Sequence, residues 1–152
     1  MTSGSRLFAE YGAYHQDRRN LICHEIGIPL IVLGIMALLR LAPVWVPWLE
    51  TSLAGVAFLA LGFYYIFAFG REYRLAVLIA GVGLAVLYVV SAYITWPFAI
   101  GAFVAGWIFQ FIGHAYEGKS PAFLTNLLHL LVGPLWVASH LVPTSASSSS
   151  AR

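Results

Sequence analysis

No charged side chain occurs between Leu75 and Gly113, and this uncharged run of 39 residues restricts the fold more than any other part of the chain. A helix satisfies its backbone hydrogen bonds within one segment, which is why apolar runs in a bilayer fold as helices. One crossing takes about 20 residues, so the run has room for two. Its only credible break is Thr95-Trp96-Pro97. We therefore predict spans over residues 75–94 and 97–115.

The composition extends this prediction to the whole chain. Hydrophobic residues make up 61% and charged residues 9% of it, whereas a soluble domain is about 25% charged. Further apolar segments predict spans over residues 21–41, 51–70 and 122–141, and apolar positions spaced by three and four residues predict a short amphipathic helix over residues 6–15. The expected fold is an all-α, polytopic transmembrane helical bundle of about five spans, with four as the alternative count. It forms a single integral-membrane domain over residues 1–143, and residues 144–152 form a disordered polar tail.

The first predicted span contains a proline and follows a polar segment. Asn20 is a suitable helix cap. A helix that began only at Pro29 would be too short to cross a bilayer, so we expect one helix with a kink near Gly27–Pro29. This helix places His24 and Glu25 in its first turns, near the headgroups.

Lysine and arginine residues set the expected orientation. With five spans, six of the eight lysine and arginine residues lie on one side of the membrane, and Arg40 and Arg152 lie on the other. The six are Arg6, Arg18, Arg19, Arg71, Arg74 and Lys119. This distribution predicts a cytoplasmic amino terminus, with the polar site on the same side. The chain has no basic stripe with interleaved aromatic residues, which excludes nucleic acid as an expected partner.

A polar stripe interrupts the apolar character of the segment 106–117. Gln110, His114 and Glu117 are four and three residues apart, so on a helix they lie along one face. Hydrocarbon offers such groups no hydrogen bonds. The stripe therefore faces other helices, or it holds a metal or a substrate.

Three of the five histidines fall near one predicted membrane face. His15, His24 and His114 can meet there, as a metal site requires, and a fourth candidate ligand, His129, can approach from the last span. His140 lies eleven residues beyond His129, too far along a helix for both to share one ion. Neutral imidazoles suit Fe(II), Zn(II) or Cu. The alternative for each histidine is a structural hydrogen bond between helices.

Two blocks of the sequence together resemble the 2-hydroxy fatty acid dioxygenases, a family of small membrane proteins. The blocks are YHQDRRNLICHEIGIP, from Tyr14, and GWIFQFIGHAYEGKSPAFLTNLL, from Gly106. The resemblance covers most of residues 10–140. It matches the family at His15, Asn20, His24, Gly27, Pro29, Trp107, Gln110, Gly113, His114, Glu117 and Pro121.

The resemblance implies an Fe(II)-dependent enzyme with histidine ligands that acts in fatty acid alpha-oxidation. Its substrates would be a long-chain 2-hydroxy fatty acid and molecular oxygen. That reaction needs no outside electrons, and the chain has no flavin or nicotinamide motif. On this hypothesis His15, His24 and His114 hold the iron, and Asn20, Gln110 and Glu117 orient ligands or substrate. Arg18 and Arg19 are either topology determinants or contacts for the anionic substrate head.

Two other functions compete with this one. A non-catalytic membrane component or small transporter would use the same polar residues as contacts between helices or as a proton path. A zinc-dependent membrane lipid hydrolase would use Glu117 or Glu25 as a general base.

Overall fold

The protein folds into α-helices apart from one short hairpin in the part of the chain that the structure describes. The computed structural model describes residues 3–47, 51–124 and 126–142. A 3-10 turn, η2 (Ala122–Leu124), precedes the last helix, and strands β1 (Trp45–Val46) and β2 (Thr51–Ser52) pair antiparallel. The helices are α1 (Ser3–Ala13), α2 (Arg18–Leu41), α3 (Leu53–Phe69), α4 (Arg74–Ser91), α5 (Trp96–Glu117) and α6 (His129–His140). The all-α prediction is confirmed.

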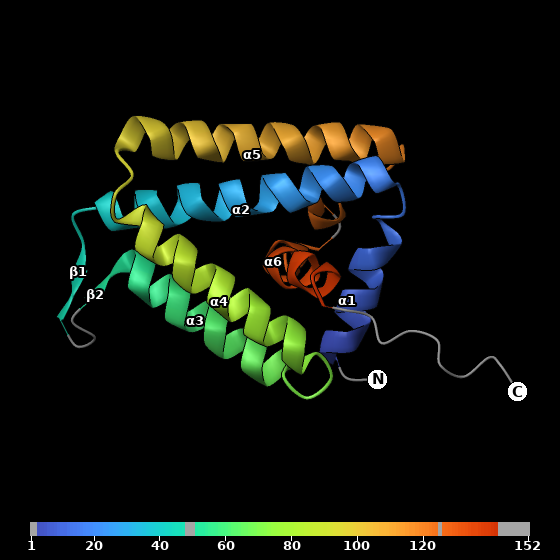
Figure 1. The fold of residues 1–152 in the computed structure, drawn as a ribbon, viewed down its shortest axis with the longest axis horizontal. Coiled ribbons are helices and arrows are strands. Elements are labelled where there is room, and N and C mark those ends of the chain that lie inside the picture. Colours follow the sequence, from blue (N-terminus) through green and yellow to red (C-terminus); the bar gives the residue numbers. More distant parts are fainter. Residues whose placement is uncertain (1–2, 48–50, 125, 143–152) are drawn as a thin grey trace, which may run out of the picture.

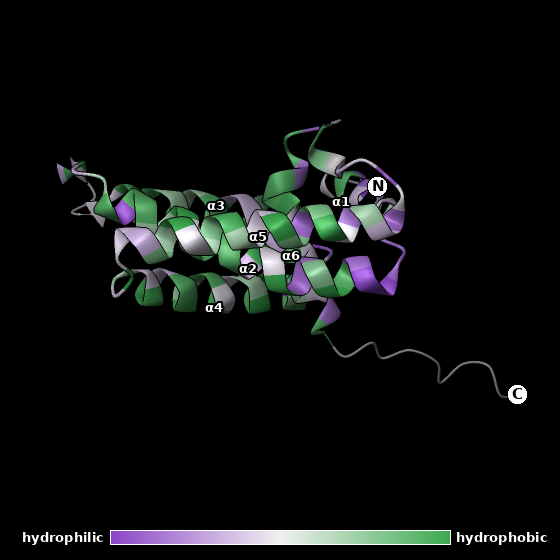
Figure 2. Cartoon of the chain, turned by 90° about the horizontal axis from the view of Figure 1, so that it is seen from above, coloured by the Kyte–Doolittle hydropathy of each residue, from purple (hydrophilic) through white to green (hydrophobic). Residues whose placement is uncertain are grey.

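The four long helices run back and forth between two ends of the molecule (Figure 1). α2 and α5 lie side by side, and α3 and α4 form a second pair across them. The hairpin lies at one end. α1 and α6 lie at the other end, which also holds the start of α2 and the end of α5. Hydrophilic residues gather at this second end, while the rest of the bundle is mostly apolar (Figure 2).

Three helices, α2, α4 and α5, are long and apolar enough to cross a membrane. α3 has 17 apolar residues, about 26 Å at about 1.5 Å per residue, and is slightly shorter than the roughly 30 Å hydrocarbon core. The predicted fifth span over residues 122–141 does not form. Its place is taken by η2 and the 12-residue α6, about 18 Å long, which packs among the other helices with half of its residues buried. Five spans are therefore not supported.

The polar start of α2 differs from its prediction in one respect. The helix begins at Arg18, and its cap is Asp17, whose side chain accepts a hydrogen bond from the Arg19 backbone amide. Asn20 lies inside the helix and is completely buried. The helix continues through Pro29 to Leu41. The predicted polar tail, residues 144–152, lies outside the described residues.

Glycines allow α2 and α5 to approach closely. A Cβ added to Gly106 would lie 2.7 Å from the Gly27 carbonyl oxygen, and one added to Gly34 would lie 2.8 Å from the Phe103 backbone nitrogen. Small residues at helix contacts let two backbones pack in van der Waals contact. This close contact fixes the height of the α2 residues relative to the α5 residues.

We expect Gly106→Ala to destabilise the protein, because its methyl group would lie 2.6 Å from Ile31 Cγ1 and force α2 and α5 apart. Overpacking of this kind costs about 1–3 kcal/mol. The matched control is Gly101→Ala on the same helix, whose added Cβ has nothing within 4 Å. Thermal unfolding in detergent should show a lower midpoint for the first variant only. Equal midpoints would show that the glycine contact does not hold the two helices together.

Candidate metal centre

Three separate elements bring three histidines together at the hydrophilic end of the bundle. His15 lies in the loop after α1, His24 in the second turn of α2, and His114 in the last turn of α5. Their relative exposures are 7%, 1% and 5%, and one ring nitrogen from each lies within 4.8 Å of the other two. The sequence-based expectation that these three residues meet agrees with the structure.

Backbone carbonyls determine the tautomer of two of the histidines. His15 Nδ1 lies 2.7 Å from the Tyr11 carbonyl oxygen, and His24 Nδ1 lies 2.9 Å from the Asn20 carbonyl oxygen. A carbonyl oxygen only accepts, so each Nδ1 carries the proton and donates it. In the neutral rings the lone pair is therefore on Nε2.

The two Nε2 atoms face each other at 2.9 Å. Two lone pairs at that distance repel, unless a proton or a cation lies between or beside them. Burial lowers the pKa of His15 to about 4, so at neutral pH a proton is a poor candidate. A metal ion fits better, because neutral imidazole nitrogen is a common metal ligand and a cation beside the two lone pairs would turn their repulsion into attraction.

His114 completes the donor set. Its ring centroid lies 4.9 Å from that of His24 and 5.2 Å from that of His15. Its Nδ1 is buried and has no hydrogen-bond partner within the described residues. A buried polar atom without a partner costs free energy unless a ligand satisfies it, so the residues present fit a bound metal ion.

Two aromatic residues that the sequence reasoning did not single out enclose the histidines. Tyr11 stacks on His15 with ring centroids 4.2 Å apart, and Trp136 of α6 lies 4.8 Å from the same ring. Both are buried, and they exclude water from one side of the centre. Tyr11 precedes His15 by one helical turn, which was a usable signal. No sequence signal pointed to Trp136, because α6 was predicted to be part of a longer span.

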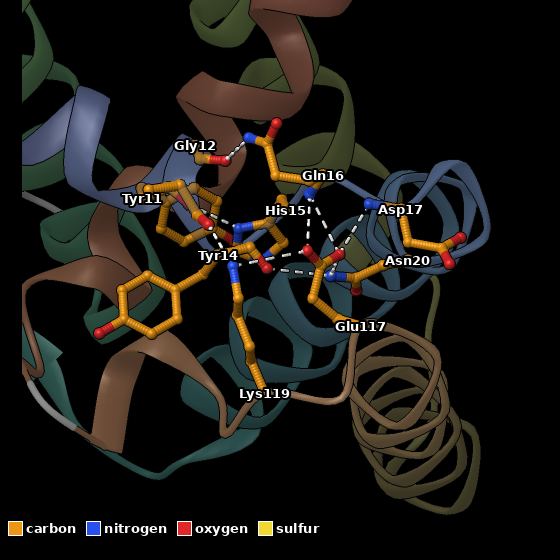
Figure 3. A network of polar contacts seen from close by, with 10 residues as sticks. Tyr11, Gly12, Tyr14, His15, Gln16, Asp17, Asn20, Glu117 and Lys119 are labelled. Carbon is orange, nitrogen blue, oxygen red and sulfur yellow. Dashed lines mark hydrogen bonds and ion pairs between the residues drawn. The ribbon is translucent and has the colours of Figure 1, made fainter.

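Glu117 ties the elements of the site together (Figure 3). Its carboxylate accepts hydrogen bonds from the backbone amides of Gln16 and Asp17 at 2.8–3.0 Å and from Asn20 Nδ2 at 3.1 Å. Only 4% of its side chain is exposed. The end of α5 thus holds the loop that carries His15 and the helix that carries His24. We call this set of contacts the Glu117 clasp.

A cavity of about 570 Å³ begins at the three histidines and extends between α2, α3, α5 and α6. This volume is within the range of about 300–1,000 Å³ that is usual for small-molecule sites. Its polar lining is concentrated near the histidines, and most of its remaining wall is aliphatic. Within the described residues, no lysine, arginine, aspartate or glutamate lines it.

The other predicted site residues lie at different distances from the centre. Gln110 lines the cavity, and its buried Nε2 has no hydrogen-bond partner in the described part of the chain. Asn20 belongs to the Glu117 clasp and does not line the cavity. His129 lines the cavity and lies 3.8 Å from Glu10 Oε2, but it is not grouped with the three histidines.

The two arginines do not reach the site. Arg18 and Arg19 are exposed, and neither lines the cavity. Arg19 forms an ion pair with Asp17 at 2.8 Å, and its guanidinium lies over the Tyr116 ring. Its hydrogen bonds lower the pKa of Asp17 to about 2, so the pair is charged at neutral pH.

Comparison with known proteins identifies the family. A family model described as "Mpo1-like: 2-hydroxy-palmitic acid dioxygenase Mpo1-like" matches residues 1–144. The chain belongs to the Mpo1-like family. The family predicted from the two sequence blocks is thereby confirmed.

A curated relative supports the same assignment. The 2-hydroxy-palmitic acid dioxygenase MPO1 of Saccharomyces cerevisiae is 30% identical to this Mpo1-like chain over 127 residues, which cover 80% of the chain and 69% of the yeast protein. The family assignment supports a dioxygenase-type enzyme of 2-hydroxy fatty acid metabolism. No solved structure matches the chain.

We expect Glu117→Gln to loosen the clasp of this Mpo1-like protein, because the amide has one acceptor oxygen and no charge. Hydrogen bonds to charged groups contribute about 1.5–3 kcal/mol, and we expect a loss of stability of about that size. Hydrogen exchange at the Gln16 and Asp17 amides should become faster. The control is Lys119→Ala, which removes a half-exposed partner 4.0 Å from Glu117 and should change stability by less than about 1 kcal/mol. Unchanged exchange in Glu117→Gln would show that the clasp does not hold the loop.

Proposed function

We propose that this protein is an Fe(II)-dependent dioxygenase that converts a long-chain 2-hydroxy fatty acid into the acid one carbon shorter and CO2. The observation that carries the proposal is the buried group of three histidines at the head of an apolar cavity. The family assignment and the name of the yeast relative point to the same substrate class.

The reaction balances without a further reductant. The hydroxy acid R–CHOH–COO⁻ and O2 give R–COO⁻, CO2 and H2O. The bond between C1 and C2 breaks, and C2 is oxidised to the new carboxylate, while C1 leaves as CO2. The substrate supplies all four electrons that reduce O2, so this proposal requires neither a flavin nor a nicotinamide.

The residues of the chain would have distinct roles. His15, His24 and His114 would hold Fe(II), which when bound would supply the redox chemistry that lets O2 react with the hydroxy acid. Their hydrogen bonds to the Tyr11 and Asn20 carbonyls keep two of the rings oriented. Gln110 Nε2 is a free donor in the cavity wall and is well placed to bind a substrate oxygen.

The charge of the substrate also points to a metal. No cationic side chain of the described residues lines the cavity, and a buried carboxylate without a counter-charge is costly. Fe(II) held by the three histidines would supply two positive charges there. The three histidines would thus place the counter-charge for the substrate carboxylate at the head of the cavity, and Arg18 and Arg19 would act at the membrane surface rather than in the site.

The aliphatic part of the cavity suits an acyl chain supplied by a bilayer. Leu130 of α6 lines the cavity and is 45% exposed, as expected if the cavity opens beside α6 onto the apolar side of the bundle. We propose that α2, α3, α4 and α5 cross the membrane and that the substrate enters from the lipid through this opening.

The distribution of basic residues supports a cytoplasmic site in this four-span arrangement. The α3–α4 turn lies beside α1, where Phe8 stacks on Tyr73 with ring centroids 4.5 Å apart. Arg40 is near the opposite, hairpin end. The side with the histidines therefore collects Arg6, Arg18, Arg19, Arg71, Arg74 and Lys119, as expected for the cytoplasmic side.

One competing function receives less support from the site. A zinc hydrolase needs a general base within hydrogen-bond reach of its water. Glu117 is engaged in the clasp, Glu25 is not part of the cavity wall, and no carboxylate of the described residues lines it. The dioxygenase proposal needs no carboxylate base.

The experiment that tests the proposal loads detergent-purified protein with Fe(II) without oxygen and then adds air and 2-hydroxypalmitic acid. We expect the acid one carbon shorter, seen by mass spectrometry, and no product without iron or without oxygen. His15→Ala, His24→Ala and His114→Ala should each lower metal affinity and activity by more than about 100-fold, since even groups that only support a ligand contribute about 10–100-fold.

Two further variants serve as controls in the same assay. His140→Ala removes a histidine whose Nδ1 bonds the Trp136 carbonyl oxygen outside the centre, and it should keep the metal and the activity. His129→Ala tests the fourth candidate ligand, because unchanged metal affinity would remove it from the ligand set. Iron-loaded, folded wild-type protein that yields no shortened acid would overturn the proposed reaction.

A further inference from the structure

The cavity has one polar end, so an amphiphilic ligand can bind in only one direction. Its histidines and Gln110 lie at the end where α2 starts and α5 ends. Along α2 the wall continues through Ile31 and Ile35 to Met36. The acid group of a bound fatty acid would therefore lie at the histidines, and its acyl chain would run along α2 toward the hairpin.

The far end of the cavity is formed by α2 and α3. Met36 on α2 and Ala57 on α3 are the lining residues nearest the hairpin on their helices. Just beyond them toward the hairpin, Ala37 and Ala54 have 0% exposure. Among the described residues, none of α2 or α3 nearer the hairpin lines the cavity, so the cavity ends at Met36 and Ala57.

The length of this path can be estimated from the helix. His24 and Met36 are 12 positions apart along α2, which is about 18 Å at about 1.5 Å per residue. A saturated chain with bonds of about 1.5 Å and angles near 111° advances about 1.25 Å per carbon. The path therefore holds about 14 carbons beyond the group at the histidines, that is, an acid of about sixteen carbons.

We propose that Met36 and Ala57 form the stop that sets the longest acyl chain the cavity accepts, and that Ala57 is the main determinant because its side chain leaves room that a larger one would fill. This inference rests on the proposed function and adds its chain-length selectivity. The Cβ of Ala57 is the whole of its side chain, whereas a leucine there would extend about 2.5 Å further, the length of about two carbons.

The test compares wild type, Ala57→Leu, Met36→Ala and Gly62→Leu on saturated 2-hydroxy fatty acids with lengths on both sides of sixteen carbons. Gly62→Leu is the matched control: it enlarges a side chain on the same helix, but Gly62 does not line the cavity, and an added Cβ has nothing within 4 Å. The measured quantity is kcat/KM at each length. Ala57→Leu should shorten the longest accepted chain by about two carbons, with at least a tenfold loss on that chain. Met36→Ala should lengthen it, and Gly62→Leu should match wild type.

Binding of the same acids is measured in parallel, by displacement of a fluorescent fatty acid from folded protein. If wild type turns over the acids and all variants show the same dependence of kcat/KM on chain length, Met36 and Ala57 do not form the stop, while the proposed reaction is still supported. Absence of turnover with a shifted binding profile in Ala57→Leu would support the stop and count against the reaction. If Gly62→Leu shifts the profile as much as Ala57→Leu, the change does not come from the end of the cavity and the proposal fails.

Discussion

The close contact of α2 with α5 is the constraint on which the rest of the structure depends. Gly27 and Gly106 let the two backbones touch, and the same contact brings His24 level with His114. A larger residue at this contact would separate the helices and with them the two histidines. Packing energy therefore positions the candidate metal ligands His24 and His114, so a bound metal would not have to draw the two helices together.

The Glu117 clasp adds what helix packing cannot supply. His15 lies in a loop, and a loop has few apolar contacts to fix it. The carboxylate at the end of α5 accepts two amides of that loop, and Asn20 of α2 donates to the same carboxylate. One buried charge thus connects all three elements that carry the histidines. Tyr11 and Trp136 then pack on the His15 ring and limit its movement.

The parts of the fold that depend on local pattern could be predicted from the sequence. Apolar runs gave the positions of α2, α3, α4 and α5 within a few residues, because hydrophobic length is a local property. The last span was predicted wrongly. The segment from Ala122 is apolar enough to resemble a span, and only tertiary packing shows that α6 is short and belongs to the site.

For the candidate site, the sequence predicted which histidines come together but not their detailed geometry. His15, His24 and His114 were found because all three fall at the same ends of predicted helices, so topology alone brings them near each other. The distances, the tautomers and the position of Trp136 depend on contacts between segments far apart in the chain. The expected role of Asn20 as a cap was wrong, since Asp17 is the cap, and the buried amide joins the Glu117 clasp.

The unpaired polar atoms around the centre indicate that the protein is built to hold ligands. His114 Nδ1 and Gln110 Nε2 are buried without partners in the described chain, and each such atom costs about 1–3 kcal/mol. The facing Nε2 atoms of His15 and His24 add repulsion. A bound metal would relieve the strain among the histidines, and a substrate oxygen would satisfy Gln110. On the proposed function, a metal and a substrate that bind only the folded state would offset these costs and stabilise the protein.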